Sequence, residues 1–155
     1  MSINEKLRVG GYPTLQLFGP DGREKDRREA TNLVVNTGME LIADKLINSA
    51  NIDVPNYMAI GEGTTTPAVT DTALEAELSP RRGFFDSFVE TSPDPISAVY
   101  VSIFGDGEAT GAITEAGIFV SQAGGVMTNR VTFPVINKLA DDNLQITWRL
   151  TFSAV

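Results

Sequence analysis

The segment GEGTTTPAVTDTALEAEL, residues 61–78, has the residue types that most resemble a ligand-binding loop. It follows the apolar run YMAI, and a strand, a glycine-rich loop and a helix in this order are typical of phosphate-binding proteins. However, the segment contains no lysine and matches neither G-x-x-x-x-G-K-[ST] nor G-x-G-x-x-G. Gly61 and Gly63 permit tight backbone geometry, and Thr72 and Glu75 have the spacing of a capping box. We therefore expect a structural loop that leads into a short helical turn.

Acidic side chains offer the next candidate chemistry. Asp106 and Glu108 could hold calcium in the loop GDGEATG, but two carboxylates are few for a shell of about six to eight oxygens. Cleavage of a glycosidic bond needs two carboxyl groups that face one cleft about 5–10 Å apart. The carboxylates considered for such a pair are Asp86, Glu90, Glu115 and Asp141. We expect each of these four to be a solvated charge, and we expect no metal site.

The composition removes most catalytic chemistry. The 155 residues include no cysteine and no histidine, so disulfides, thiolate nucleophiles, zinc–thiolate sites and serine–histidine–aspartate triads are excluded. We therefore expect no catalytic residue, no cofactor and no enzyme activity. The net charge of −8 disfavours direct binding to nucleic acid. No apolar run approaches the roughly 20 residues that a membrane-spanning helix needs, and the polar N-terminus shows no signal peptide.

The clearest secondary-structure pattern lies at the C-terminal end of the chain. One parity of residues 143–153 is apolar, namely Leu144, Ile146, Trp148, Leu150 and Phe152. The other parity is polar, which predicts a half-buried strand. Similar runs separated by turn residues precede it and indicate about six to eight strands. We therefore predict a mainly β protein, an antiparallel jelly-roll-like sandwich, with Phe133 and this apolar parity in its core.

Residues 36–50, NTGMELIADKLINSA, predict one amphipathic helix. Its apolar stripe has the spacing i, i+3, i+4, i+7 and consists of Met39, Ile42, Ala43 and Leu46. Thr37 and Glu40 have capping-box spacing at the start of the helix. We expect this helix to cover one side of the β core, with Met39, Ile42 and Leu46 packed against it.

Three segments taken together resemble the small virion proteins of tailed bacteriophages. They are TNLVVNTGMELIADKLI, MAIGEGTTTPAVTDTALEAEL and ITEAGIFVSQAGGVMTNRVTFPVINKLADDNLQITWRLTF. The similarity covers residues 32–152 and is specific in the combination of its pieces. Proteins of this group occur as capsid decoration (cement) proteins and as tail-associated structural proteins.

The resemblance implies a virion structural protein without enzyme activity. Its leading form is a capsid decoration protein that binds and stabilises the lattice of the major capsid protein. Such a protein would be made in the host cytoplasm, form a homo-oligomer (a dimer or trimer) and lie on the capsid exterior. One alternative is a tail, baseplate or fibre component with tail proteins as partners. Another is a carbohydrate-binding module, which is disfavoured because Trp148 lies on an apolar parity and is expected in the core.

Residues 1–31 are expected to form an N-terminal arm, a hairpin outside the β-sandwich domain of residues 32–155. The turn residues GPDG, at positions 19–22, separate its two strands. One interpretation is a solvated hairpin, because its second strand carries mixed charges. The other is an arm that contacts a neighbouring subunit or the capsid lattice, since its apolar residues would be costly to expose and its arginines could form bidentate pairs with carboxylates. The possible assembly contacts are Leu15, Leu17, Phe18, Arg27 and Arg28.

Overall fold

Two five-stranded sheets and one helix make up the part of the chain that the computed structural model describes, residues 5–155. The first sheet has the spatial order β2 (Glu24–Glu29), β1 (Leu7–Phe18), β10 (Asn143–Ala154), β7 (Ile96–Phe104) and β6 (Asp86–Glu90). The second sheet has the order β3 (Leu33–Val34), β9 (Met127–Lys138), β8 (Gly111–Phe119), β4 (Tyr57–Gly61) and β5 (Glu77–Gly83). The helix α1 spans Asn36–Leu46 and follows β3.

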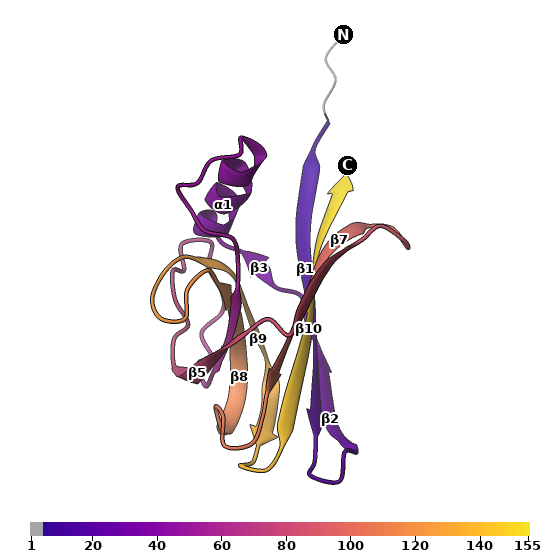
Figure 1. The fold of residues 1–155 in the computed structure, drawn as a ribbon, viewed down its shortest axis with the longest axis vertical. Helices are drawn as coiled ribbons and strands as arrows, with labels where there is room; N and C mark the ends of the chain where they lie inside the picture. Colours follow the sequence, from indigo (N-terminus) through magenta and orange to yellow (C-terminus); the bar gives the residue numbers. More distant parts are fainter. Residues whose placement is uncertain (1–4) are drawn as a thin grey trace.

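The two sheets face one another, and α1 lies at one end of them (Figure 1). The paired strands of both sheets run antiparallel. The predicted mainly β antiparallel sandwich with one helix is therefore confirmed. In the first sheet, β10 lies between β1 and β7 in two long antiparallel ladders, so most of its residues are hydrogen-bonded to a neighbouring strand on each side.

The core between the sheets contains the apolar parity that the sequence predicted for β10. Leu144, Ile146 and Trp148 are fully buried there, and Leu150 and Phe133 are buried as well. Trp148 also satisfies its indole N–H, because Nε1 donates a hydrogen bond to Asn32 Oδ1 at 2.6 Å. Phe152 departs from the expectation, since it is only half-buried near the open end of the strand.

The N-terminal hairpin exists but is not an arm. β1 and β2 are paired across a turn that begins at Gly19, as predicted. However, β1 also lies against β10 over its whole length, from Leu7 opposite Ala154 to Phe18 opposite Asn143. The hairpin is therefore part of the sandwich, and the expected boundary at residue 31 does not separate two packed units. The apolar residues of β1 that the sequence assigned to an assembly contact pack instead within the sandwich, at Leu15 and Leu17.

The helix lies where the sequence placed it, but it packs through a different face. Its buried residues are Gly38 and Leu41, whereas Met39 is 45% exposed and Leu46 is 80% exposed. A Cβ atom at Gly38 would lie 2.0 Å from the carbonyl oxygen of Thr128, so only glycine allows the helix to approach β9 this closely. The predicted packing through Met39 and Leu46 is therefore wrong.

The start of the helix also differs from the capping-box prediction. No side chain caps α1 at its N-terminus. The hydroxyl of Thr37 instead donates a hydrogen bond to the carbonyl oxygen of Met127 on β9, at 2.6 Å. This bond and the close approach at Gly38 fix the first turn of α1 on the second sheet.

Truncation of Trp148 should show how much of the stability depends on this core. We expect Trp148→Ala to lower the free energy of unfolding by about 3–5 kcal/mol, because it removes a fully buried aromatic side chain and leaves a cavity. Leu139→Ala, at a residue that is 56% exposed, is the matched control and should change it by less than about 0.5 kcal/mol. Urea unfolding followed by circular dichroism measures both. Equal effects of the two variants would contradict the assignment of Trp148 to the core.

Candidate functional site

A buried ion pair joins β9 and β8, two neighbouring inner strands of the second sheet. Arg130 of β9 donates from Nη2 and Nε to Oε2 of Glu115 on β8, at 3.0 and 3.1 Å. The two side chains are only 3% and 0% exposed. They lie on the outer face of the sheet, because their chain neighbours Ala116 and Val131 belong to the core between the sheets. A buried pair of this kind is stable only when its remaining polar atoms also find partners.

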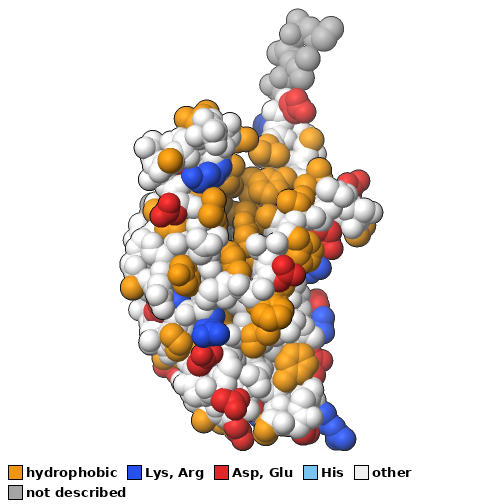
Figure 2. Space-filling view, viewed as in Figure 1, with side chains coloured by type: hydrophobic (Ala, Val, Ile, Leu, Met, Phe, Trp, Pro, Cys, Tyr) orange, Lys and Arg blue, Asp and Glu red, His pale blue; other side chains and the backbone are white. Residues whose placement is uncertain are grey.

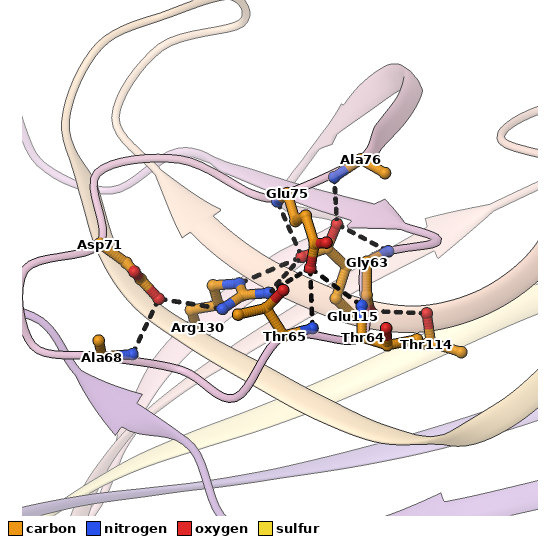
Figure 3. A network of polar contacts seen from close by, with 10 residues as sticks. All are labelled: Gly63, Thr64, Thr65, Ala68, Asp71, Glu75, Ala76, Thr114, Glu115 and Arg130. Carbon is orange, nitrogen blue, oxygen red and sulfur yellow. Dashed lines mark hydrogen bonds and ion pairs between the residues drawn. The ribbon is translucent and has the colours of Figure 1, made fainter.

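The loop between β4 and β5, residues 62–76, supplies partners for Glu115. Oε1 of Glu115 accepts hydrogen bonds from the backbone N–H groups of Gly63, at 3.1 Å, and Ala76, at 2.7 Å. Oε2 accepts a third from the N–H of Glu75, at 3.1 Å. Figure 3 shows that both ends of the loop thereby converge on one carboxylate. The loop is held closed across the outer face of the sheet.

Two carboxylates of the loop itself complete the network. Asp71 accepts from Nη1 of Arg130 at 3.0 Å and from the backbone N–H of Ala68 at 2.9 Å. Glu75 accepts from the backbone N–H groups of Thr64, at 3.1 Å, and Thr65, at 2.8 Å (Figure 3). Hydrogen bonding from Thr65, through its side chain and then its backbone, holds the pKa of Glu75 below its ordinary value.

The loop is thus a structural cover, although its local conformation differs from the prediction. Residues 62–76 contain no helical turn, and the carboxylate of Glu75 binds the opposite side of the loop instead of capping a helix. The side chain of Leu74, in the loop, packs against the outer face of the sheet. It is buried there in a second, smaller apolar cluster with Val35, Ala59, Phe119 and Met127.

The other carboxylates considered as catalytic candidates lie apart from this network. Asp86 and Asp141 are exposed, as predicted, and Glu90 forms an ion pair with Arg149 at 3.0 Å. The prediction of a solvated charge was wrong for Glu115, because the covering loop encloses it. Among residues 5–155, no group of three or more acidic side chains is arranged to hold a metal ion.

The acidic loop between β7 and β8 is likewise held by contacts within the chain. Glu108 accepts a hydrogen bond from the backbone N–H of Gly105 at 2.8 Å and forms an ion pair with Arg82 at 3.1 Å. Asp106 is exposed. The ammonium group of Lys138 donates to the carbonyl oxygen of Gly105 at 2.8 Å, and burial lowers the pKa of Lys138. The ammonium group of Lys138 therefore lies beside this loop and is one of the contacts that hold it.

Asp142 is a second buried carboxylate that the sequence did not single out. Its side chain is 0% exposed and accepts from Lys25 Nζ at 2.8 Å and from the backbone N–H of Leu139 at 3.0 Å. Burial raises the pKa of Asp142, but these hydrogen bonds lower it by more, so the net pKa lies below the ordinary value. The contact ties β2 to the turn between β9 and β10. The sequence gives little indication that Asp142 is buried, because it stands next to Asp141, a residue of the same type that is exposed.

The residues predicted as assembly contacts lie in two different environments. Leu15 and Leu17 are 0% and 2% exposed in the chain's own core, so the prediction that they contact another subunit was wrong. Phe18 is half-buried. Arg28 donates to the backbone oxygens of Pro134 and Val135, at 3.1 and 2.9 Å, and its guanidinium is thereby committed to β9.

Arg27 is the most exposed of these five residues. Its side chain is 49% exposed and lies 3.4 Å from Glu24 and 3.5 Å from Glu29. Exposed pairs of this kind contribute little to stability. The outer strand β2 is therefore a mostly exposed strand of mixed charge that Lys25 and Arg28 fasten to the rest of the chain, while the inner strand β1 belongs to the core.

Within residues 5–155, no helix combines the length and the apolar character needed to cross a membrane. Comparisons with protein-family models, with curated proteins and with solved structures found no match.

Neutralising Glu115 should destabilise the protein strongly. We expect Glu115→Gln to lower the free energy of unfolding by about 3–5 kcal/mol, because it leaves the buried charge of Arg130 without its main partner. Asp141→Asn neutralises an exposed carboxylate as the control and should change the free energy by less than about 0.5 kcal/mol. Urea unfolding provides the measurement.

A double variant separates the ion pair from simple packing. Glu115→Gln combined with Arg130→Met removes both charges, and we expect it to be more stable than Glu115→Gln alone because no buried charge remains unpaired. Arg130→Met alone completes the comparison. If the changes in unfolding free energy caused by Glu115→Gln and by Arg130→Met simply add in the double variant, the proposed coupling between Glu115 and Arg130 is absent.

The contribution of Asp142 should depend on pH. Its folded pKa lies below the ordinary value of 3.8, so the stability that it provides is complete above that value and is lost as the pH falls through the lower folded pKa. The difference in unfolding free energy between the wild type and Asp142→Asn should therefore be largest near neutral pH and shrink in acid. The control Asp86→Asn should show a difference that stays small throughout. Chemical unfolding at a series of pH values tests this, and a gap for Asp142→Asn that widens in acid would contradict the assignment.

Proposed function

We propose that the chain is a structural protein of a tailed-bacteriophage virion, and specifically a capsid decoration (cement) protein that binds the lattice of the major capsid protein. The resemblance of residues 32–152 to small phage virion proteins supports this proposal. The structural observation that carries it is the number of large apolar side chains left on the surface. Several exceed two-thirds exposure: Phe85 at 76%, Val89 at 70%, Leu46 at 80% and Ile47 at 79%.

These side chains gather at two places, on α1 with its following residues and on the β6 edge of the first sheet. Gathered apolar surface of this kind is typical of interfaces with other proteins. A rigid sandwich with apolar contact surfaces suits a protein that binds a repeating lattice, since its contacts keep a fixed geometry from copy to copy. The net charge of −8 favours the capsid exterior over contact with packaged nucleic acid. The protein would be made in the host cytoplasm and carried on the virion.

A structural role is proposed in place of a catalytic one because the candidate groups are engaged or solvated. The carboxylates of Glu115 and Glu108 are bound by N–H groups and guanidinium groups of the chain itself. Asp86 and Asp141 are exposed singly on different strands and turns. None of these four carboxylates lies in a cleft beside a second reactive side chain, which is the arrangement that a nucleophilic or acid–base mechanism requires.

Two alternatives remain distinct from the decoration protein. A tail, baseplate or fibre component would use the same exposed apolar surfaces on tail proteins instead of the capsid lattice. A carbohydrate-binding module would need aromatic faces open to a sugar. The tryptophan of this chain, Trp148, is 0% exposed and offers no such face.

The copy number of the protein in the particle distinguishes the first two roles. In a cryo-electron microscopy reconstruction of the phage that encodes this chain, a decoration protein should follow the symmetry of the capsid lattice. Recombinant protein should also cosediment with capsids from which it is missing. Density restricted to the tail would contradict the decoration role and support the alternative, and absence from the purified particle would contradict both.

A further inference from the structure

An apolar groove opens between α1 and the first sheet. It has a volume of about 330 Å³, at the lower end of the roughly 300–1,000 Å³ typical of small-molecule sites. Its apolar walls come from α1, β7 and β10 and include Leu41, Ile42, Leu46, Tyr100, Leu150 and Phe152. Figure 2 shows the hollow, with apolar side chains gathered between the helical lobe and the strands opposite it. The half-burial of Phe152 and the exposure of Leu46 follow from this opening.

The β6–β7 hairpin is a projecting apolar element on the same molecule. All five residues of β6 are at least partly exposed, and the hairpin carries Phe88 at 46% exposure, Val89 at 70% and Ile96 at 49%. The end of the sheet at β7 curves away from the second sheet at the upper right of Figure 1. Neither face of the hairpin tip is covered by a second sheet, and its apolar side chains have no partner layer.

A comparison of the four sheet edges sets β6 apart. β2 has the charged sequence EKDRRE, β3 has only two residues, and β5 contains Pro80 followed by two arginines. Charge, shortness and proline are the devices by which edge strands avoid pairing with other chains. β6 has charges only at its ends, with Ser87, Phe88 and Val89 between them. Of the four edges within residues 5–155, β6 is thus the one whose middle is apolar and unprotected.

The groove and the hairpin are neighbours in the structure, and they differ in their charged residues. Phe152 lines the groove and also lines the hollow beside Pro95 and Ile96 at the base of the hairpin. Lys45 is the charged residue among those that line the groove. Its side chain is 32% exposed, and its ammonium group lies 3.2 Å from the carboxylate of Asp44 on the same helix. The segment from 83 to 96 contains three acidic residues and no basic one. An acidic hairpin with apolar side chains therefore lies beside an apolar groove that has one lysine at its rim.

We infer that the groove receives the β6–β7 hairpin of a second copy of this chain, and that two copies exchange hairpins about a two-fold axis. A two-fold contact requires one self-complementary patch, in which the projecting and receiving parts lie side by side. The adjacency at Phe152 provides this arrangement, because each hairpin can reach the partner's groove while its own groove is filled in return. The contact buries Val89 against the helix, because Val89 and Phe88 point to opposite faces of β6, and it brings the acidic hairpin toward Lys45. The inference does not depend on the location of the protein in a virion.

Engineered cysteines test the contact directly, because the natural chain contains none. Val89→Cys protein mixed with Leu46→Cys protein should form an intermolecular disulfide under mild oxidation. The control mixture replaces Leu46→Cys with Val135→Cys, at a residue that is 41% exposed and lies several residues along β9 from the groove. Faster cross-linking of the first mixture supports the exchange of hairpins, and equal rates overturn it.

Charge substitutions test the same contact without cross-links. Sedimentation velocity over a concentration series should show a wild-type dimer. Val89→Asp and Leu46→Asp should each weaken self-association by about tenfold or more, as expected for a substitution in the centre of an interface. Val135→Asp is the matched control and should leave the dimer intact. Circular dichroism confirms that each variant is folded.

A mixture of the two disruptive variants provides the sharpest test. In a homodimer of either variant both hairpin–groove contacts are damaged, whereas in the mixed dimer one contact is fully wild-type and the other carries both changes. Val89→Asp and Leu46→Asp should therefore associate with each other more strongly than either does alone. A wild-type monomer at every concentration, a groove occupied instead by a copurifying small apolar molecule, or a mixture no stronger than its components would each overturn the inference. None of these results bears on particle occupancy, which tests the proposed function separately.

Discussion

The arginine buried on β9 is the constraint that shapes the second sheet. Arg130 lies on the outer face of the sheet beneath the β4–β5 loop, and a guanidinium that is 3% exposed must have carboxylates around it. Glu115 on the neighbouring strand β8 forms an ion pair with Arg130. The carboxylate oxygens of Glu115 then need further hydrogen-bond donors. The β4–β5 loop supplies these from its backbone, at Gly63 and Ala76. The loop conformation is thus a consequence of one ion pair beneath it, and so is the burial of Leu74 on the same face.

The covering loop also explains why the two sheets have different sequence patterns. β10 alternates between buried and half-buried residues, because one of its faces lies in the core and the other is open. On β8, Glu115–Phe119 are all buried, because the sandwich core covers one face and the loop covers the other. A strand that is covered on both faces shows no period of two, and its buried outer positions can hold a charged residue when a partner is present. The second sheet is therefore the middle layer of a local three-layer arrangement.

The same difference decides what the sequence could predict. The alternation of Leu144, Ile146 and Trp148 was sufficient to place β10 and its core face correctly, because burial there follows strand parity alone. The environment of Glu115 could not be predicted, since its partner on β9 and the loop above it are brought together only by tertiary structure.

Two further errors have local physical causes. The helix stripe was misassigned because Gly38 lets the backbone itself contact β9, which rotates Met39 and Leu46 toward the surface. β1 was taken for part of an arm because its apolar residues were assigned to a contact with a neighbouring subunit or the capsid lattice, whereas Leu15 and Leu17 pack in the chain's own core. In both cases the deciding contact is made with a strand distant in sequence, β9 or β10.

Long-range charge and short-range apolar contact act against each other in any assembly of this protein. Copies with a net charge of −8 repel one another, and this repulsion extends over roughly 10 Å at moderate ionic strength. The unprotected β6 edge is thereby kept from indiscriminate pairing in free solution, although its middle residues are apolar. A mainly apolar contact, such as the one proposed between the hairpin and the groove, can still form once two copies meet in the correct orientation. On a repeating lattice the copies are held close together, and effective concentration then strengthens contacts that are individually weak. An acidic body with one apolar edge therefore favours ordered association over aggregation.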